Sequence, residues 1–338
     1  MSREMTCLGF QTNDAVPVKF TLPIPEVSGR DLLIEIDAIA VNPVDTKVKA
    51  GIKGKLDSAK VIGWDAAGTV IAAGDECELI KVGDKVFYAG DISRPGCYAS
   101  HQVVDERIVG FAPKSLSASK AAAMPLTSIT AWEALFSRMR IHPNLDKGKT
   151  LLIVGAAGGV GSIAIQLAKQ VAELNVVATA SREESIAWCR ELGADHVINH
   201  HRLNEDYAKL GISPPDYILC LGDTDPYFEQ LAELVAPQGL ICFVVTSQKN
   251  HNIDLLKTKS AGIVWEFMFT RPMYQTYDIT AQHQLLNRIA EMLDEGMLRC
   301  TMKHDLGPMS VATITEAHQM LLSGKTLGKI TLQAIEAG

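Results

Sequence analysis

The chain has 338 residues, of which 47% are hydrophobic, so it can bury a large core and is long enough for two domains. Its net charge is −7 and no run of lysine or arginine stands out, which argues against nucleic acid as a partner. The longest apolar runs fall well short of the roughly 20 residues that a membrane span needs, and the first residues lack the apolar core of a signal peptide. We therefore expect a soluble, cytoplasmic protein without a membrane partner.

Seven cysteines are scattered along the chain without any C-x-x-C pair. Such scatter is typical of reduced, mostly buried thiols. It argues against both a disulfide framework and a zinc cluster.

The first third of the chain has the pattern of strands and turns. Residues 31–37 contain a period-two alternation, and residues 81–87 place a turn before another strand. This spacing predicts a compact β-rich domain, which we place at residues 1–122. Two stretches in it do not look like ordinary scaffold, AVNPVDTKVKAG at 40–51 and VIGWDAAGTV at 61–70.

A different pattern follows the β-rich part. Residues 151–154 form a short apolar run typical of a buried strand, and the turn after it has the spacing A-x-G-x-x-G at Ala156, Gly158 and Gly161. An amphipathic helix continues from this turn, which makes it the dinucleotide fingerprint with alanine in the first glycine's place. The backbone groups expected to hold the pyrophosphate are those of Gly158, Gly159, Val160 and Gly161. The alternative is a plain glycine-rich turn between a strand and a helix.

The next strand, residues 175–180, should end at the residue that selects the coenzyme. An acid about 20 residues past the glycines would accept the ribose hydroxyls of NAD, but Ala180, Ser181 and Arg182 occupy this turn. A hydroxyl, free backbone donors and a guanidinium suit a 2′-phosphate better than a bare ribose. We therefore predict NADP(H), held by Ser181 and Arg182. Alternatively, Arg182 is a solvated residue at the start of a helix over 183–192.

Strands and helices continue to alternate after this turn, which predicts an α/β domain with a parallel, doubly wound sheet over residues 123–268. The expected strands are residues 196–199, 217–221 and 239–245, and the expected helices are residues 183–192 and 226–235. Ligands of such sheets bind beyond the carboxyl ends of the strands. Leu221 and Phe243 are therefore candidate coenzyme contacts by topology alone.

The last part of the chain, residues 269–338, lies outside this nucleotide unit. It has helical patterns at 280–295 and 314–322 and ends with a strand at 328–332. We expect this strand to return to the first domain, which would then be discontinuous in sequence.

These pieces, in this order, resemble the medium-chain dehydrogenase/reductase superfamily. Within it the chain is similar to the quinone-oxidoreductase branch and to the group labelled zinc-type alcohol dehydrogenase-like proteins. The matching phrases are collinear over the chain and include VNPVDTKVKAG, GWDAAGTV, GAAGGVGS, ELGADHVI and the closing LGKI. The resemblance implies a GroES-like catalytic domain, a Rossmann domain for the coenzyme, and NADPH-dependent reduction of a quinone, an enone or a reactive carbonyl.

The chain departs from the zinc-dependent members of the superfamily at the metal. Those members place a cysteine where Asn42 stands, a histidine where Trp64 stands and a third ligand near Leu126, and they carry a lobe of four cysteines that this chain lacks. An amide, an indole and an alkyl chain cannot supply the three or four donors that zinc needs, so we predict no catalytic zinc. We interpret His200 and His201 as surface loop residues.

Without a metal to polarise an alcohol, alcohol oxidation is the less favoured chemistry, whereas reduction of a quinone or enone needs only a hydrogen-bond donor and a proton for the developing oxyanion. Asn42, Asp45 and Lys47 are the first catalytic candidates, because the resemblance places the loop VNPVDTK along the nicotinamide cleft. Lys47 could donate to a substrate oxygen. The alternative for Asn42 and Asp45 is a turn and helix cap in which both side chains bond to the local backbone.

Other candidates have weaker support. Trp64 would form a wall of the cleft or fill the space that the metal vacates, with a packed core residue as the alternative. Tyr88 and Tyr98 could each donate a proton, although tyrosine in a β domain is more often core. The resemblance places Thr130 at the domain junction, where it could contact the coenzyme. Lys329 is similarly placed as a coenzyme contact, although we slightly favour a surface lysine.

Residues 264–269, VWEFMF, are strongly apolar for a sheet edge, and an exposed edge of this kind usually needs cover. Subunits of the superfamily that the chain resembles often pair sheet to sheet. We therefore expect a homodimer or a larger assembly, with an internal strand covered by the tail helices as the alternative.

Two other functions stay open at this point. One is an alcohol dehydrogenase that recruits metal through ligands not recognised above. The other is an NADPH-binding sensor or structural protein with little or no catalysis. Activity that survives a chelator would exclude the first, and oxidation of NADPH by a quinone or an enone would exclude the second.

Overall fold

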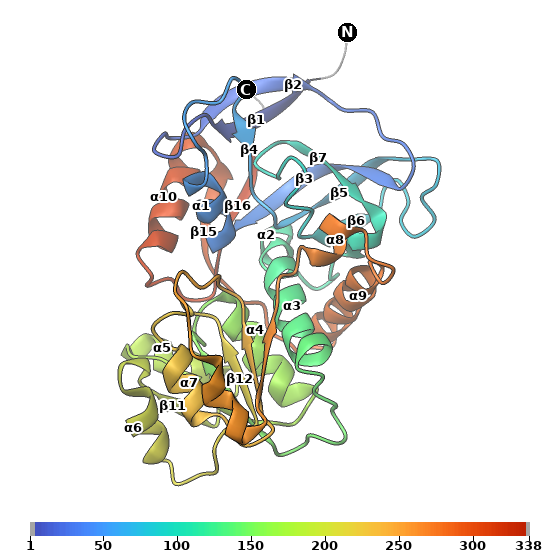
Figure 1. Ribbon diagram of the computed structural model, residues 1–338. Helices are drawn as coiled ribbons and strands as arrows, with labels where there is room; N and C mark the ends of the chain where they lie inside the picture. Colours follow the sequence, from blue (N-terminus) through green and yellow to red (C-terminus); the bar gives the residue numbers. More distant parts are fainter. Residues whose placement is uncertain (1–3, 336–338) are drawn as a thin grey trace. The chain divides into compact units, whose positions relative to one another are not determined.

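The computed structural model describes residues 4–335, which divide into two compact units (Figure 1). The first unit combines residues 4–129 with residues 269–335, so it is discontinuous in sequence, and the second unit is residues 130–268. The division falls inside helix α3 (Pro125–Trp132). The predicted domain ends before residue 4 and after residue 335 lie outside the described residues.

Within the described residues, the first unit contains a seven-stranded sheet and a three-stranded sheet. The larger has the order β15-β16-β3-β5-β6-β8, with β7 also paired to β3, and the smaller has the order β2-β1-β4. Its strands are β1 (Glu4–Phe10), β2 (Val18–Pro23), β3 (Asp31–Val41), β4 (Lys60–Val61), β5 (Ala66–Ala73), β6 (Lys85–Tyr88), β7 (His101–Asp105), β8 (Val109–Phe111), β15 (Met302–Met309) and β16 (Lys329–Ile335). The C-terminal strand β16 thus belongs to the sheet of the N-terminal strands.

Strand β3 extends beyond the predicted 31–37, because its last residues are buried between β5 and β16. Val41 pairs with Ile330 of the antiparallel strand β16. The residue after Val41 and the residue before Ile330 are therefore neighbours in space. These two residues are Asn42 and Lys329, which lie far apart in the sequence.

The first unit also contains helices, of which α3 continues into the second unit. They are α1 (Pro43–Ala50), α2 (Ala118–Ala122), α3, α8 (Thr270–Tyr274), α9 (Ala281–Asp294) and α10 (Val311–Leu322), with the 3-10 turn η1 (Glu106–Ile108). Helix α1 begins where the sequence predicts a turn and cap, with Asn42 as N-cap and Pro43 at the first helical position, where its missing N–H costs nothing. Helices α9 and α10 include most of the predicted helices at 280–295 and 314–322.

The second unit is the predicted α/β domain with a parallel sheet. Its strands have the order β11-β10-β9-β12-β13-β14 and all pair in parallel. They are β9 (Thr150–Val154), β10 (Asn175–Thr179), β11 (His196–Ile198), β12 (Tyr217–Cys220), β13 (Leu240–Phe243) and β14 (Gly262–Trp265). The helices are α4 (Gly159–Gln170), α5 (Glu183–Glu191), α6 (Leu203–Ala208) and α7 (Phe228–Leu234), with η2 (Glu133–Arg138), η3 (His200–Arg202) and η4 (Ile253–Lys259). The order reverses at β9, which makes the sheet doubly wound.

Two expectations from composition can be compared with the structure. All seven cysteines are free, and five of them are buried. Across residues 4–335, no helix is both long and apolar enough to cross a membrane.

Candidate active site and coenzyme site

The glycine turn follows the carboxyl end of β9, where the strand order reverses and ligands of such sheets bind. Helix α4 starts at Gly159 with Gly158 as N-cap, so its first N–H groups are available to an anion. A Cβ on Gly161 would lie 2.4 Å from the carbonyl oxygen of Ala156, whereas a Cβ on Gly158 would meet no atom nearer than 3.6 Å. Packing therefore requires glycine at 161, whereas position 158 would tolerate a Cβ.

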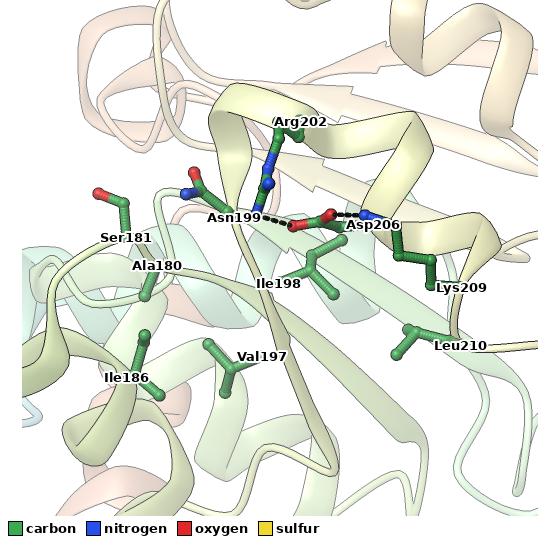
Figure 2. A pocket seen from close by; sticks show the side chains of 10 residues that line it. All are labelled: Ala180, Ser181, Ile186, Val197, Ile198, Asn199, Arg202, Asp206, Lys209 and Leu210. Atoms are coloured by element: carbon green, nitrogen blue, oxygen red, sulfur yellow. Dashed lines mark hydrogen bonds and ion pairs between the residues drawn. The ribbon is translucent and has the colours of Figure 1, made fainter.

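A pocket of about 480 Å³ lies beyond the carboxyl ends of β10 and β11 (Figure 2). Its polar lining consists of Ser181, Asn199, Arg202, Asp206 and Lys209. One carboxylate serves both cations there: Arg202 Nη2 lies 3.5 Å from one oxygen of Asp206, and Lys209 Nζ lies 2.8 Å from the other. The ionised lining thus carries one positive charge in excess, which suits an anionic ligand.

Only one of the two residues predicted to hold a 2′-phosphate lines this pocket. Ser181 is exposed in it, whereas Arg182 is half-buried as the N-cap of α5 and is not part of the lining. Sequence reasoning missed Arg202 and Lys209, which follow β11. The rule that ligands bind beyond strand ends could have found them, had it been applied to β11 as it was to β12 and β13.

The other predicted coenzyme contacts are placed differently from one another. Gly159 and Val160 are half-buried in the first turn of α4, and Leu221 is half-buried just after β12. Phe243 is fully buried in the core of the second unit, where its ring stacks on Phe228, so the predicted coenzyme contact could come only from its backbone and stays a prediction. Thr130 is buried in α3.

In the first unit, the loop VNPVDTK forms the start of α1. The backbone N–H of Asn42 donates to Asp45 Oδ2 at 2.8 Å, as in a capping box. Asn42 is 1% exposed and Asp45 is 0% exposed. The Asp45 side chain thus bonds to the local backbone, as the turn-and-cap alternative expects.

The side chain of Asn42 joins a buried ion pair. Lys329 Nζ lies 3.0 Å from Asp65 Oδ2 and also donates to Asn42 Oδ1 and to the carbonyl oxygen of Val41, the latter at 3.0 Å. The Asn42 amide nitrogen donates to Asp65 Oδ2 at 3.2 Å and to the carbonyl oxygen of Ala40 at 3.4 Å. Lys329 is 3% exposed, so the surface-lysine reading is wrong.

A second buried chain of contacts continues from Asp45. The Tyr98 hydroxyl donates to Asp45 Oδ2 at 2.9 Å and lies 3.0 Å from His318 Nε2, on helix α10. Burial raises the pKa of Asp45 from 3.8 to about 7, against the hydrogen bonds from Asn42 and Tyr98. Burial also lowers the pKa of His318 to about 4. The network thus contains a carboxyl group that titrates near neutral pH.

Burial and exposure separate the remaining catalytic candidates. Trp64 is fully buried, its indole N–H donates to the carbonyl oxygen of Asp91 at 3.0 Å, and its ring meets Phe269 edge-on. These contacts are those of a packed core residue, the alternative reading of Trp64. Tyr88 is also fully buried. Lys47 is exposed on α1.

Comparisons with known proteins agree with this arrangement. Residues 28–122 match the family described as alcohol dehydrogenase GroES-like domain, and residues 159–281 match the family described as zinc-binding dehydrogenase. A zinc-type alcohol dehydrogenase-like protein of Staphylococcus epidermidis is 39% identical over 317 residues, which cover 93% of this chain and 94% of the relative. The chain belongs to this family of the medium-chain dehydrogenase/reductase superfamily.

Other members of the superfamily extend the comparison. A Rhizobium etli protein described as a zinc-dependent alcohol dehydrogenase superposes with a TM-score of 0.94 at 43% identity, covering 100% of both chains. An NADPH-dependent alkenal/one oxidoreductase of Arabidopsis thaliana is 33% identical and covers 72% of this chain and 64% of its own length. The quinone oxidoreductase of Coxiella burnetii has a TM-score of 0.81 at 26% identity, covering 98% of this chain and 99% of its own. The chain is thus an oxidoreductase of this superfamily.

The family name implies zinc, and the residues at the three ligand positions do not fit it. The amide of Asn42 is bonded within the ion-pair network, the indole of Trp64 is bonded to the Asp91 backbone, and Leu126 presents an alkyl chain. Among residues 4–335, no group of three histidine, cysteine, aspartate or glutamate side chains could hold a metal ion. The rings of His200 and His201 lie against one another, tilted by 45°, in η3 of the second unit.

The sequence reasoning missed two members of the buried network and set aside a third. Asp65 follows Trp64 in the stretch GWDAAGTV. The sequence analysis singles out this stretch but does not name Asp65 as a candidate. His318 lies inside an ordinary helical pattern, which offers no signal. Tyr98 was considered as a donor and set aside as core, and it is both buried and bonded to Asp45.

Proposed function

We propose that this chain is a metal-independent, NADPH-dependent reductase that transfers a hydride to a quinone, an enone or a reactive carbonyl. The observation that carries the proposal is the pocket beyond β10 and β11, in which Ser181, Arg202 and Lys209 offer a hydroxyl and two cations. These groups suit the 2′-phosphate that distinguishes NADPH from NADH. The Arabidopsis relative named for NADPH and for alkenal and enone substrates, and the Coxiella quinone oxidoreductase, support the same substrate classes.

Coenzyme preference tests the pocket directly. Arg202→Ala and Lys209→Ala should each raise the KM for NADPH about tenfold, the usual effect of one charge-assisted hydrogen bond, and leave the KM for NADH unchanged. Lys147→Ala is the matched control, because Lys147 pairs with Glu173 in the same unit and does not line the pocket. Arg182→Ala measures the remaining predicted contact. If the KM for NADPH of Arg202→Ala, Lys209→Ala and Arg182→Ala equalled that of the control Lys147→Ala, the 2′-phosphate would bind elsewhere.

Among the predicted catalytic residues, the structure favours Lys47 as the donor to the substrate. Bound NADPH supplies a hydride to an electron-poor carbon, and the oxygen that gains charge needs a hydrogen-bond donor and then a proton. The amide hydrogens of Asn42 are both engaged within the protein, and Asp45 is buried against Asn42 and Tyr98. We assign positioning to Asn42 and Asp45 and donation to Lys47, whose replacement by methionine should lower kcat.

The decisive assay follows the loss of NADPH absorbance with a panel of quinones, enones, 2-alkenals and aldehydes, with and without a chelator. Turnover that survives the chelator supports the metal-independent reductase. Turnover that the chelator abolishes would identify a metal-dependent alcohol dehydrogenase instead. Absence of turnover across the panel, with NADPH bound, would identify a non-catalytic NADPH-binding protein.

We also propose a homodimer formed through β14. Among the described residues this strand pairs with β13 alone, so no strand lies along its other edge, and Trp265 on it is 51% exposed. A second copy could extend the sheet at this edge. Light scattering should give a dimer mass at micromolar concentration, and Trp265→Glu should shift it towards the monomer. A monomer mass for the unchanged protein would contradict the proposal.

A further inference from the structure

We propose that Lys329 is a resident cation that fixes the Asn42 amide and, paired with Asp65, keeps a metal ion from binding where zinc-dependent members of the superfamily hold one. Its ammonium group contacts three oxygens, those of Asp65 Oδ2, Asn42 Oδ1 and the Val41 carbonyl. An ammonium group has three N–H bonds, so the three oxygens use all of them. Both Lys329 and Asp65 are buried, which makes this a desolvated and charge-balanced pair.

The ammonium contacts one of the three positions at which those members place a zinc ligand, and its partner Asp65 contacts another. It bonds directly to Asn42, the first position. Asp65 follows Trp64, the second position, in the sequence. The other oxygen of Asp65 accepts the backbone N–H of Leu126, the third position, at 3.1 Å. The Lys329–Asp65 pair thus links the first and the third position.

This placement explains how the site can dispense with a metal. A divalent ion would be repelled by the ammonium, and the carboxylate nearest to it is already neutralised. The ammonium also fixes the Asn42 amide, whose oxygen accepts from Lys329 while its nitrogen donates to Asp65. Lys329 is therefore a positioning residue. The inference rests on the proposed metal-independent function, to which it adds the pair of residues that excludes a metal.

Chemical rescue tests the inference without a substrate. Lys329→Ala removes three methylene groups and the ammonium, which n-propylammonium can restore. The variant should melt about 10 °C below the wild-type protein, because it leaves the Asp65 charge buried without its cation. Millimolar n-propylammonium chloride should then raise its Tm by several degrees over sodium chloride of equal ionic strength.

Two controls make the rescue specific. The wild-type protein should show no such rise. Lys85→Ala should show none either, because Lys85 is 65% exposed and pairs with Asp37 at the surface of the same unit. Rescue of all three proteins alike, or a Lys329→Ala variant with an unchanged Tm, would overturn the proposal.

A charge-balanced double variant covers the case in which Lys329→Ala does not fold. Lys329→Met with Asp65→Asn removes both charges and keeps similar volumes, so it should fold and melt above the single variant Lys329→Met. A double variant no more stable than the single one would refute the charge pairing. The chelator-treated reductase assay tests the proposed function, whereas the melting temperatures test the Lys329–Asp65 pair. Failure of one proposal can therefore be told from failure of the other.

Discussion

The titration of Asp45 gives a quantitative test of the buried network. We consider the substitution Asp45→Asn, which keeps the shape of the side chain and removes its charge. The asparagine oxygen can still accept from Tyr98 and from the Asn42 backbone. The variant therefore isolates the cost of ionising this group inside the protein.

The magnitude follows from the shift in pKa. Burial raises the pKa of Asp45 from 3.8 to about 7, and one unit corresponds to about 1.4 kcal/mol, so ionisation in the folded state costs about 4 kcal/mol more than in the unfolded chain. The charged and titratable groups that face Asp45 are Lys329, Asp65, Tyr98 and Cys97, and His318 lies beyond Tyr98. All of these are present in both proteins.

The sign follows because the folded state binds this proton more tightly than the unfolded state. The wild-type protein loses the Asp45 contribution as pH rises from about 4 through about 7, whereas the variant has no such group to ionise. The free energy of unfolding of Asp45→Asn, minus that of the wild-type protein, should therefore rise by about 4 kcal/mol between pH 4 and pH 7 and then level off.

Urea unfolding followed by circular dichroism at half-unit pH steps measures this difference. Asp57→Asn is the matched control for this substitution, because Asp57 is exposed in the same unit. A constant difference for Asp45→Asn, or one that falls as pH rises, would refute the assignment of a raised pKa.

Two further predictions concern the second unit. Gly161→Ala should destabilise the protein by about 2 kcal/mol or more, because the new Cβ would meet the backbone of the preceding turn at 2.4 Å. Gly158→Ala should leave Tm unchanged and weaken NADPH binding at least about tenfold. Equal losses of Tm in the two variants would contradict this division of roles. Arg138→Met should lower the free energy of unfolding by about 3 to 5 kcal/mol, because the buried carboxylates of Glu133 and Glu266 lose the guanidinium that lies 3.2 Å and 2.9 Å from them. A decrease below about 1 kcal/mol in urea unfolding would contradict this.

Part of the candidate site could be predicted from the sequence because its signals are local. The glycine turn depends on backbone geometry within a few residues, so Gly158 and Gly161 were recognised from their spacing and the flanking strand and helix. The cap at Asn42 was among the predicted alternatives for the same reason. Ser181 was found by counting along the chain to the next strand end.

The rest could not be predicted, because it depends on contacts between segments far apart in the sequence. Lys329 looked like a surface lysine, since only the pairing of β16 with β3 brings its ammonium to Asn42 and Asp65. Phe243 looked like a strand-end contact, since only the packing of α7 on the sheet shows that its ring is core.

The sequence by itself determined the α/β class and the glycine turn, because these depend on local pattern. Its resemblance to the superfamily located the three positions that lack zinc-ligand residue types. The tertiary structure alone decided which charges are buried together. A lysine and an aspartate are solvated in the extended chain, and they become a desolvated pair only when the last strand joins the third strand in one sheet. That pairing converts a surface-type residue into the cation of the site.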